Sequence, residues 1–126
     1  MIQRLLLEGA TKRAGAYAHA VVANGMVYVS GQGPGNPDTG AIPETFEAQV
    51  HQVFANVKQI LEGSKSQLSD VIKLNVYLSD LETFGAYNRI YEEYFGEVLP
   101  ARTTVGCSLL GFMVEVDCVA AVRADA

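Results

Sequence analysis

The sequence predicts an α+β fold in which one mixed β-sheet carries two helices on one face. Two segments, residues 45–62 and 80–95, have the apolar spacing of amphipathic helices. Short apolar segments before, between and after them have the composition or the alternation of strands. The expected order is β-β-β-α-β-α-β-β, and a length of 126 residues predicts a single domain over residues 1–126.

Three strands are expected in the first third of the chain, at residues 4–8, 18–23 and 26–30. Asn24-Gly25 separates the last two and has the chemistry of a tight hairpin turn. Residues 31–40 follow with four glycines and two prolines. This loop must therefore turn sharply or let its backbone approach another group closely.

The two central elements differ in their apolar period. The first helix has a stripe at three- and four-residue spacing, formed by Phe46, Val50, Val53, Val57, Ile60 and Leu61. The strand at residues 71–78 alternates instead. One of its sides is expected to hold Ile72, Leu74, Val76 and Leu78, and the other Lys73, Asn75 and Tyr77.

The second helix is expected to begin with Asp80 as its N-cap, and strands at residues 103–108 and 113–122 close the chain. In the last strand Glu115 and Asp117 alternate with apolar residues. The sheet face that the helices leave open therefore mixes charged and apolar side chains. Such a face predicts a contact between subunits with polar pockets in it.

Composition narrows the class of function. Nine basic and 14 acidic residues give a net charge of −5, and the densest basic spot is Lys12-Arg13. The sequence lacks the basic run that nucleic-acid binding requires. Cys107 and Cys118 lack the spacing of a zinc site or a disulfide framework, and no segment approaches membrane-spanning length. We expect a cytoplasmic enzyme without a metal, a nucleic-acid partner or a membrane partner.

Five segments carry a more specific signal: Gly15-Ala16-Tyr17-Ala18-His19-Ala20, Val29-Ser30-Gly31-Gln32, Asn88 followed by residues 91–96, Pro100-Ala101-Arg102-Thr103-Thr104, and Val114-Glu115-Val116-Asp117. In this order they resemble the RidA/YjgF family of reactive-intermediate deaminases, from about residue 9 to residue 122. The resemblance implies a chorismate-mutase-like fold and a homotrimer with pockets at the subunit interfaces. It also implies hydrolysis of 2-aminoacrylate and related imines to 2-keto acids and ammonia, without a cofactor.

Arg102 and Glu115 are the candidate catalytic residues. The guanidinium of Arg102 can hold a carboxylate by two parallel hydrogen bonds, but a surface charge or an ion pair between subunits would explain it equally. Burial of Glu115 in an apolar strand would raise its pKa toward the working pH; an interface carboxylate paired with a cation is the alternative. The resemblance places Arg102 on the substrate carboxylate and Glu115 on the attacking water.

Six further residues are candidates for binding the substrate: Tyr17, Ser30, Gly31, Asn88, Thr104 and Phe112. The resemblance associates Tyr17 and Asn88 with the pocket, although a core or interface role would suit the tyrosine as well. Ser30 and Gly31 end a strand, where backbone groups become free to bind a ligand or simply form a turn. Thr104 stands where some family members carry a reactive cysteine, and Phe112 is a candidate wall for a larger substrate.

Departures from the common family pattern at Ala16, His19 and residues 33–36 leave the substrate open. One alternative is a catabolic deaminase of an unsaturated amino acid such as 2-aminomuconate. Another is a non-catalytic trimer that binds small keto acids. Ribonuclease activity is disfavoured by the net charge of −5. A neutral structural role is the expectation for His19.

Overall fold

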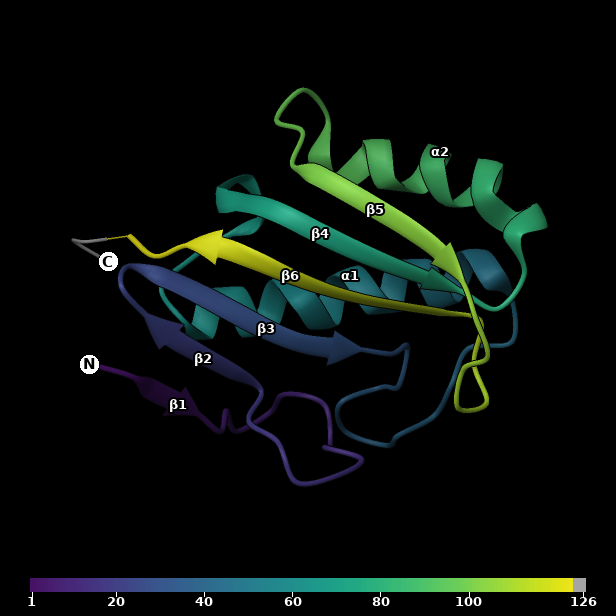
Figure 1. Cartoon of the computed structure of the whole chain (residues 1–126). Coiled ribbons are helices and arrows are strands. Elements are labelled where there is room, and N and C mark those ends of the chain that lie inside the picture. The colour runs from purple at the N-terminus through teal and green to yellow at the C-terminus, as the bar shows by residue number, and fades with distance from the viewer. Residues whose placement is uncertain (124–126) are drawn as a thin grey trace.

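Six strands form one sheet in this computed structural model, which describes residues 1–123. The strands lie in the order β1-β2-β3-β6-β4-β5 (Figure 1). Their bounds are Gln3–Leu5 (β1), Ala20–Ala23 (β2), Met26–Gln32 (β3), Val71–Leu78 (β4), Ala101–Gly106 (β5) and Val114–Ala121 (β6). Each neighbouring pair is antiparallel except β4 and β5, which are parallel. The predicted mixed sheet is confirmed.

Two helices, α1 (Phe46–Gly63) and α2 (Phe84–Phe95), complete the predicted order of elements. Thr45 caps α1, because its side chain accepts a hydrogen bond from the backbone N–H of Ala48. α1 packs on β3 and β6 and also against α2, and Figure 1 shows α1 running behind the sheet. The α+β class is thus confirmed. Within residues 1–123, neither helix is long and apolar enough to cross a membrane.

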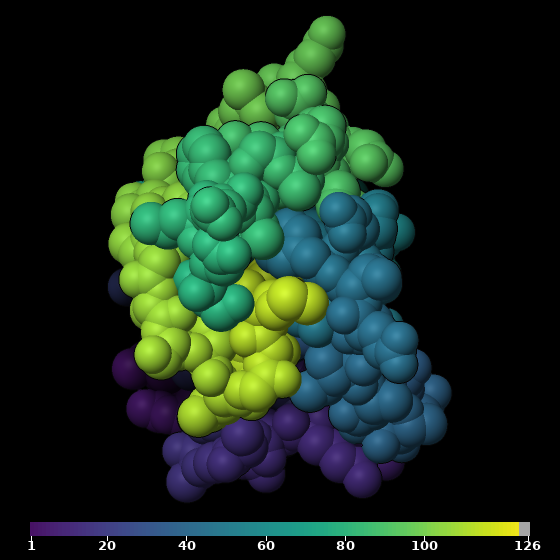
Figure 2. Space-filling view, turned by 90° about the vertical axis from the view of Figure 1, so that its right-hand side faces the viewer, coloured from purple at the N-terminus to yellow at the C-terminus, as the bar shows by residue number. Residues whose placement is uncertain are grey.

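Three loops that are far apart in the sequence meet at one end of the sheet. They are residues 10–19 before β2, residues 33–45 between β3 and α1, and residues 107–113 between β5 and β6. Figure 2 views the molecule from this side and shows the purple, blue and yellow-green segments next to one another. Residues of all three loops line one cavity.

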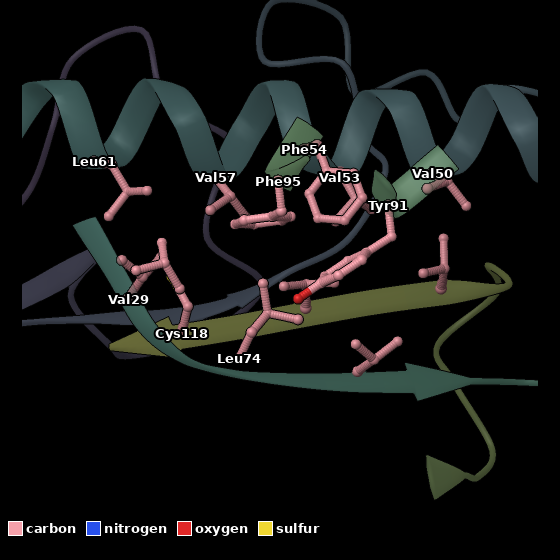
Figure 3. Packing of buried hydrophobic residues seen from close by; sticks show 14 of the residues in the cluster. Val29, Val50, Val53, Phe54, Val57, Leu61, Leu74, Tyr91, Phe95 and Cys118 are labelled. Carbon is pink, nitrogen blue, oxygen red and sulfur yellow. The ribbon is translucent and has the colours of Figure 1, made fainter. Parts of the chain in front are cut away.

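The apolar stripe of α1 packs onto the sheet. Figure 3 shows Val53, Val57 and Leu61 pointing from the helix toward Leu74 of β4 and Cys118 of β6. All five side chains are buried. Burying a side chain of this size stabilises a fold by about 1.5–3 kcal/mol, so this layer fixes α1 over the centre of the sheet.

Aromatic rings join the two helices. The ring of Phe54 in α1 lies 5.9 Å from Tyr87, 6.3 Å from Tyr91 and 5.7 Å from Phe95, measured between ring centroids. These separations are typical of favourable aromatic pairs. The cluster holds α2 in a fixed position, and with it the helix face that carries Asn88.

Two local predictions were wrong. Asp80 accepts a hydrogen bond from the N–H of Glu82 and begins a short 3₁₀ turn, while α2 itself begins at Phe84. Ile72 is 52% exposed and Val71 is buried. The cause is a shift in the register of β4 against β6 between Val71 and Lys73, which turns Ile72 away from the core.

Beyond that shift, β4 and β6 alternate as predicted. Leu74 and Cys118 face the helices, whereas Asn75, Tyr77 and Asp117 lie on the open face. Asp117 accepts hydrogen bonds from Asn75 Nδ2 at 2.8 Å and from Tyr77 Oη at 2.7 Å. The bond to Asp117, with partial burial, raises the pKa of Tyr77 to about 12. A polar cluster is therefore built into the open face beside Glu115.

Candidate functional site

A cavity of about 710 Å³ lies where the three loops meet. Five residues predicted from the sequence line it: Tyr17, Ser30, Gly31, Phe112 and Glu115. They come from the loop before β2, the end of β3, the loop before β6, and β6 itself. Folding thus brings together five candidates that span almost a hundred residues of sequence.

Glu115 lies directly against the backbone of Gly31. A Cβ at Gly31 would overlap the carboxylate oxygen Oε2, so a larger residue here would push the carboxylate out of its present position. Burial and, to a lesser degree, the charge of Asp117 raise the pKa of Glu115. A raised pKa makes the carboxylate a better proton acceptor for general-base chemistry.

Gln32 holds the strand end that carries Gly31. Its side chain is 3% exposed, and its amide donates to the carbonyl oxygens of Ser30 and Gly31 at 3.1 and 3.3 Å. Its Oε1 accepts a hydrogen bond from Thr11 Oγ1 at 2.6 Å. Sequence reasoning assigned no role to Thr11 or to the Gln32 side chain. A glutamine at a core-facing strand position was the available signal.

His19 ties the loop before β2 together. Its Nδ1 accepts a hydrogen bond from the N–H of Leu7 at 3.0 Å, and its Nε2 lies 2.7 Å from the carbonyl oxygen of Thr11. The first contact needs an unprotonated Nδ1 and the second a proton on Nε2, so the ring is neutral in this arrangement. The geometry gives His19 a structural role beside the cavity.

Tyr17 closes a short loop at the cavity edge. Its Oη accepts a hydrogen bond from the N–H of Ala14 at 2.9 Å, and its carbonyl oxygen accepts one from Arg13 Nη1 at 3.0 Å. The ring is 40% exposed. The phenol proton therefore remains free to donate to a ligand.

Phe112 packs on another glycine of the cavity wall. A Cβ at Gly33 would lie 3.0–3.3 Å from the Phe112 ring. Next to it, the N–H of Met113 donates to Gln49 Oε1 at 2.8 Å, and Gln49 also donates to the carbonyl oxygen of Pro43. One buried glutamine of α1 thus fixes two of the three loops, and the predicted close approach of the glycine loop occurs at Gly31 and Gly33.

Arg102 lies in a second, separate recess between β5 and α2. Its Nη2 donates to Asn88 Oδ1 at 2.7 Å, and its Cζ lies 4.7 Å from the centroid of the Tyr91 ring and 5.5 Å from that of Tyr87. The recess is also lined by Gly96 and other residues of the α2–β5 connection. Aromatic faces and an amide oxygen hold the guanidinium in one orientation.

The two candidate catalytic residues lie on opposite faces of the sheet. Arg102 pairs with Leu74, whose side chain is in the core beneath the helices, while Glu115 pairs with Tyr77 on the open face. Thr104 lies on the Arg102 side and lines neither cavity. A single chain therefore presents two half-sites that one small substrate could not reach together.

Metal ligands do not gather in the part of the chain that the structure describes: no three side chains of His, Cys, Asp or Glu lie close enough together there to hold an ion.

Comparison with known proteins decides the family. Residues 8–122 match the family model described as Endoribonuclease L-PSP. A RutC family protein of Aquifex aeolicus is 42% identical over 105 residues, which cover 82% of this chain and 84% of the relative. This chain belongs to the RidA/YjgF family. The family expected from the sequence motifs is confirmed.

Solved RidA-family structures agree with the fold. RidA from an Antarctic Psychrobacter species is 35% identical and superposes with a TM-score of 0.91, covering 95% of this chain and 99% of that one. TdcF of E. coli, solved with bound serine, is 29% identical with a TM-score of 0.89, covering 96% of this chain and 100% of TdcF. The arrangement of sheet and helices is thus that of the RidA family.

Proposed function

We propose that this chain hydrolyses imines that carry a carboxylate, of the 2-aminoacrylate and 2-iminopropanoate type, to a 2-keto acid and ammonia. The observation that carries the proposal is the position of Glu115. Its carboxylate has a raised pKa, lies against the backbone of Gly31 and lines a cavity. Membership of the RidA family supports the same chemistry. In this proposal, side chains and backbone groups carry out the reaction without a cofactor.

Arg102 is the proposed anchor for the substrate carboxylate. One N–H of Arg102 Nη2 donates to Asn88 Oδ1, and the guanidinium makes no other hydrogen bond within residues 1–123. The remaining N–H groups can bind a carboxylate by two parallel bonds. The rings of Phe84, Tyr87 and Tyr91 surround the guanidinium and reduce its contact with water, which strengthens such a pair.

We propose a homotrimer, as the resemblance to the RidA family implies, with sites shared between its subunits. Because Arg102 and Glu115 lie on opposite faces of one sheet, we propose that each complete site takes Arg102 from one subunit and Glu115 from its neighbour. The open sheet face supports this assembly, since it exposes Tyr28 and Val105 beside polar groups. Apolar side chains exposed in this way are typical of subunit contacts.

The proposed reaction needs one water. Arg102 holds the substrate carboxylate, and Glu115 takes a proton from the water while its oxygen bonds to the imine carbon. The nitrogen takes the electron pair of the former double bond and the proton from Glu115, which gives a carbinolamine and returns Glu115 to its carboxylate form. Glu115 then moves the hydroxyl proton of the carbinolamine to the amine nitrogen, the C–N bond breaks, and ammonia leaves as the keto group forms. Positioning supplies much of the acceleration.

Ammonia release from 2-iminopropanoate, formed in situ by an amino-acid oxidase, tests the proposal. Wild type should accelerate release, and Arg102→Ala and Glu115→Gln should each be inactive. Co-expression of the two inactive variants should restore about a quarter of wild-type activity, because a randomly mixed trimer regains one intact site. Absence of restored activity would rule out sites shared between subunits.

A deaminase of 2-aminomuconate would use the same groups, and ammonia-release assays with 2-aminomuconate and 2-iminopropanoate separate the two functions. A non-catalytic trimer would bind keto acids without ammonia release, and it leaves the raised pKa of Glu115 unexplained.

We propose a cytoplasmic location, since Cys107 and Cys118 are both unpaired thiols.

A further inference from the structure

The cavity around Glu115 has a charge opposite to that of the whole chain. Overall, 14 acidic residues outnumber nine basic ones. The residues that line this cavity nevertheless include two cations, Lys12 and Arg13, against one carboxylate, that of Glu115. A cleft lined by an excess of one charge attracts ligands of the other. The cavity therefore favours an anionic ligand.

Within residues 1–123, neither cation forms an ion pair. Among residues 1–123, the one ion pair between a basic and an acidic side chain joins Arg123 to Asp70. Arg13 Nη1 donates a hydrogen bond to the carbonyl oxygen of Tyr17 at 3.0 Å. This bond holds the guanidinium at the cavity edge, and its other N–H groups can still donate to a ligand. Lys12 precedes it on the same loop. The cavity wall thus contains two cations that can bind an anionic group of a ligand.

We propose that Lys12 and Arg13 bind a second carboxylate at the far end of the substrate, so that the preferred substrates are imines of dicarboxylic amino acids. The inference rests on the proposed function, in which Arg102 already holds the carboxylate beside the imine carbon. With Glu115 at the reacting carbon, the far end of the substrate can meet the two cations, because all three residues line the same cavity. A cavity of about 710 Å³ is in the range that encloses a whole small ligand.

The test compares two imines of equal length that differ in one carboxylate: 2-iminoglutarate and 2-iminopentanoate, formed by oxidases from glutamate and norvaline. In the double variant Lys12→Gln/Arg13→Gln, kcat/KM for 2-iminoglutarate should fall about 10- to 100-fold, the loss of charge-assisted hydrogen bonds. For 2-iminopentanoate it should change less than about twofold. Lys12→Gln alone keeps the Arg13–Tyr17 bond and should give a smaller selective loss.

A matched control removes the same charge elsewhere. Lys58→Gln/Lys65→Gln changes two exposed lysines outside the cavity and should leave the preference between the imines unaltered. Equal losses on both imines in the Lys12/Arg13 variant, or no loss on either, would overturn the inference. Hydrolysis of 2-iminopentanoate without a preference for 2-iminoglutarate would also overturn it, while leaving the proposed function standing.

Binding separates the two proposals where neither imine is hydrolysed. In that case the proposed function fails, and calorimetric titration with the stable keto acids decides the inference. Wild type should bind 2-oxoglutarate about tenfold more tightly than 2-oxopentanoate, and Lys12→Gln/Arg13→Gln should remove that difference. Equal affinity of wild type for the two acids would refute a second carboxylate site.

Discussion

The backbone of Gly31 lies so close to the carboxylate of Glu115 that a Cβ at this glycine would overlap Oε2. We therefore expect Gly31→Ala to displace the carboxylate from its seat. A displacement near 1 Å at a reacting group lowers a rate by about 100-fold, and kcat for imine hydrolysis should fall by about that factor. Ammonia release under saturating imine measures the loss.

Gly85 supplies the control for this variant. A Cβ there would meet Arg89 Nη1 only at 3.8 Å, an ordinary contact on the surface of α2. Gly85→Ala should keep kcat within about twofold of wild type. If a folded Gly31→Ala protein matched the wild-type rate, the carboxylate would not need its present position.

A second prediction concerns pH. Burial raises the pKa of Glu115, and the negative charge of Asp117 raises it further. Since the carboxylate form accepts the proton of water, activity should fall as pH drops through this pKa. Asp117→Asn removes the like charge and lowers the pKa of Glu115, so the acidic limb of kcat/KM against pH should move to lower pH. If the acidic limb of the Asp117→Asn variant stays in place or moves to higher pH, Glu115 is not the general base.

Alternation in the sequence predicted which side chains share a face, and it did so correctly for most of β4 and β6. It failed at Ile72, because the register shift at the start of β4 depends on how two distant segments hydrogen-bond. A sequence period contains no information on that pairing. The start of α2 was misplaced for a similar reason, since Asp80 caps a 3₁₀ turn that looks like a helix start.

The candidate site was predicted in its parts but not in its arrangement. Glu115 and Gly31 were both named from the sequence, yet their contact depends on the pairing of β3 with the distant strand β6. The bond from Thr11 to Gln32 joins residues 21 apart, and no local pattern announces it. The placement of Arg102 and Glu115 on opposite faces required the pairing of β4 with both β5 and β6.

His19 gives a third prediction, on stability. The ring is 6% exposed and satisfies the N–H of Leu7 and the carbonyl oxygen of Thr11. Removing it leaves two partly buried backbone groups without partners, so His19→Ala should lower the free energy of unfolding by about 1–3 kcal/mol. His19→Gln offers one donor and one acceptor and should restore part of the loss. Urea unfolding at one fixed protein concentration measures both.

A smaller loss in His19→Ala than about 0.5 kcal/mol, the range of ordinary surface changes, would show that these contacts do not stabilise the fold. Equal losses in the alanine and glutamine variants would indicate that shape rather than hydrogen bonding matters at this position.

The last prediction links the proposed activity of Glu115 to stability. Its pKa is raised in the folded chain by burial and by Asp117, so folding favours the protonated form. The free energy that this group contributes is present below its unfolded pKa and is lost as pH rises through its folded pKa. Glu115→Gln, which stays neutral, should therefore raise Tm relative to wild type at pH 8 but not at pH 4. Thermal unfolding of both proteins at the two pH values measures the difference. If Glu115 served only to stabilise the fold, its carboxylate would have a favourable partner, and Glu115→Gln would be less stable than wild type at pH 8. That result would contradict a residue kept for catalysis at a cost in stability.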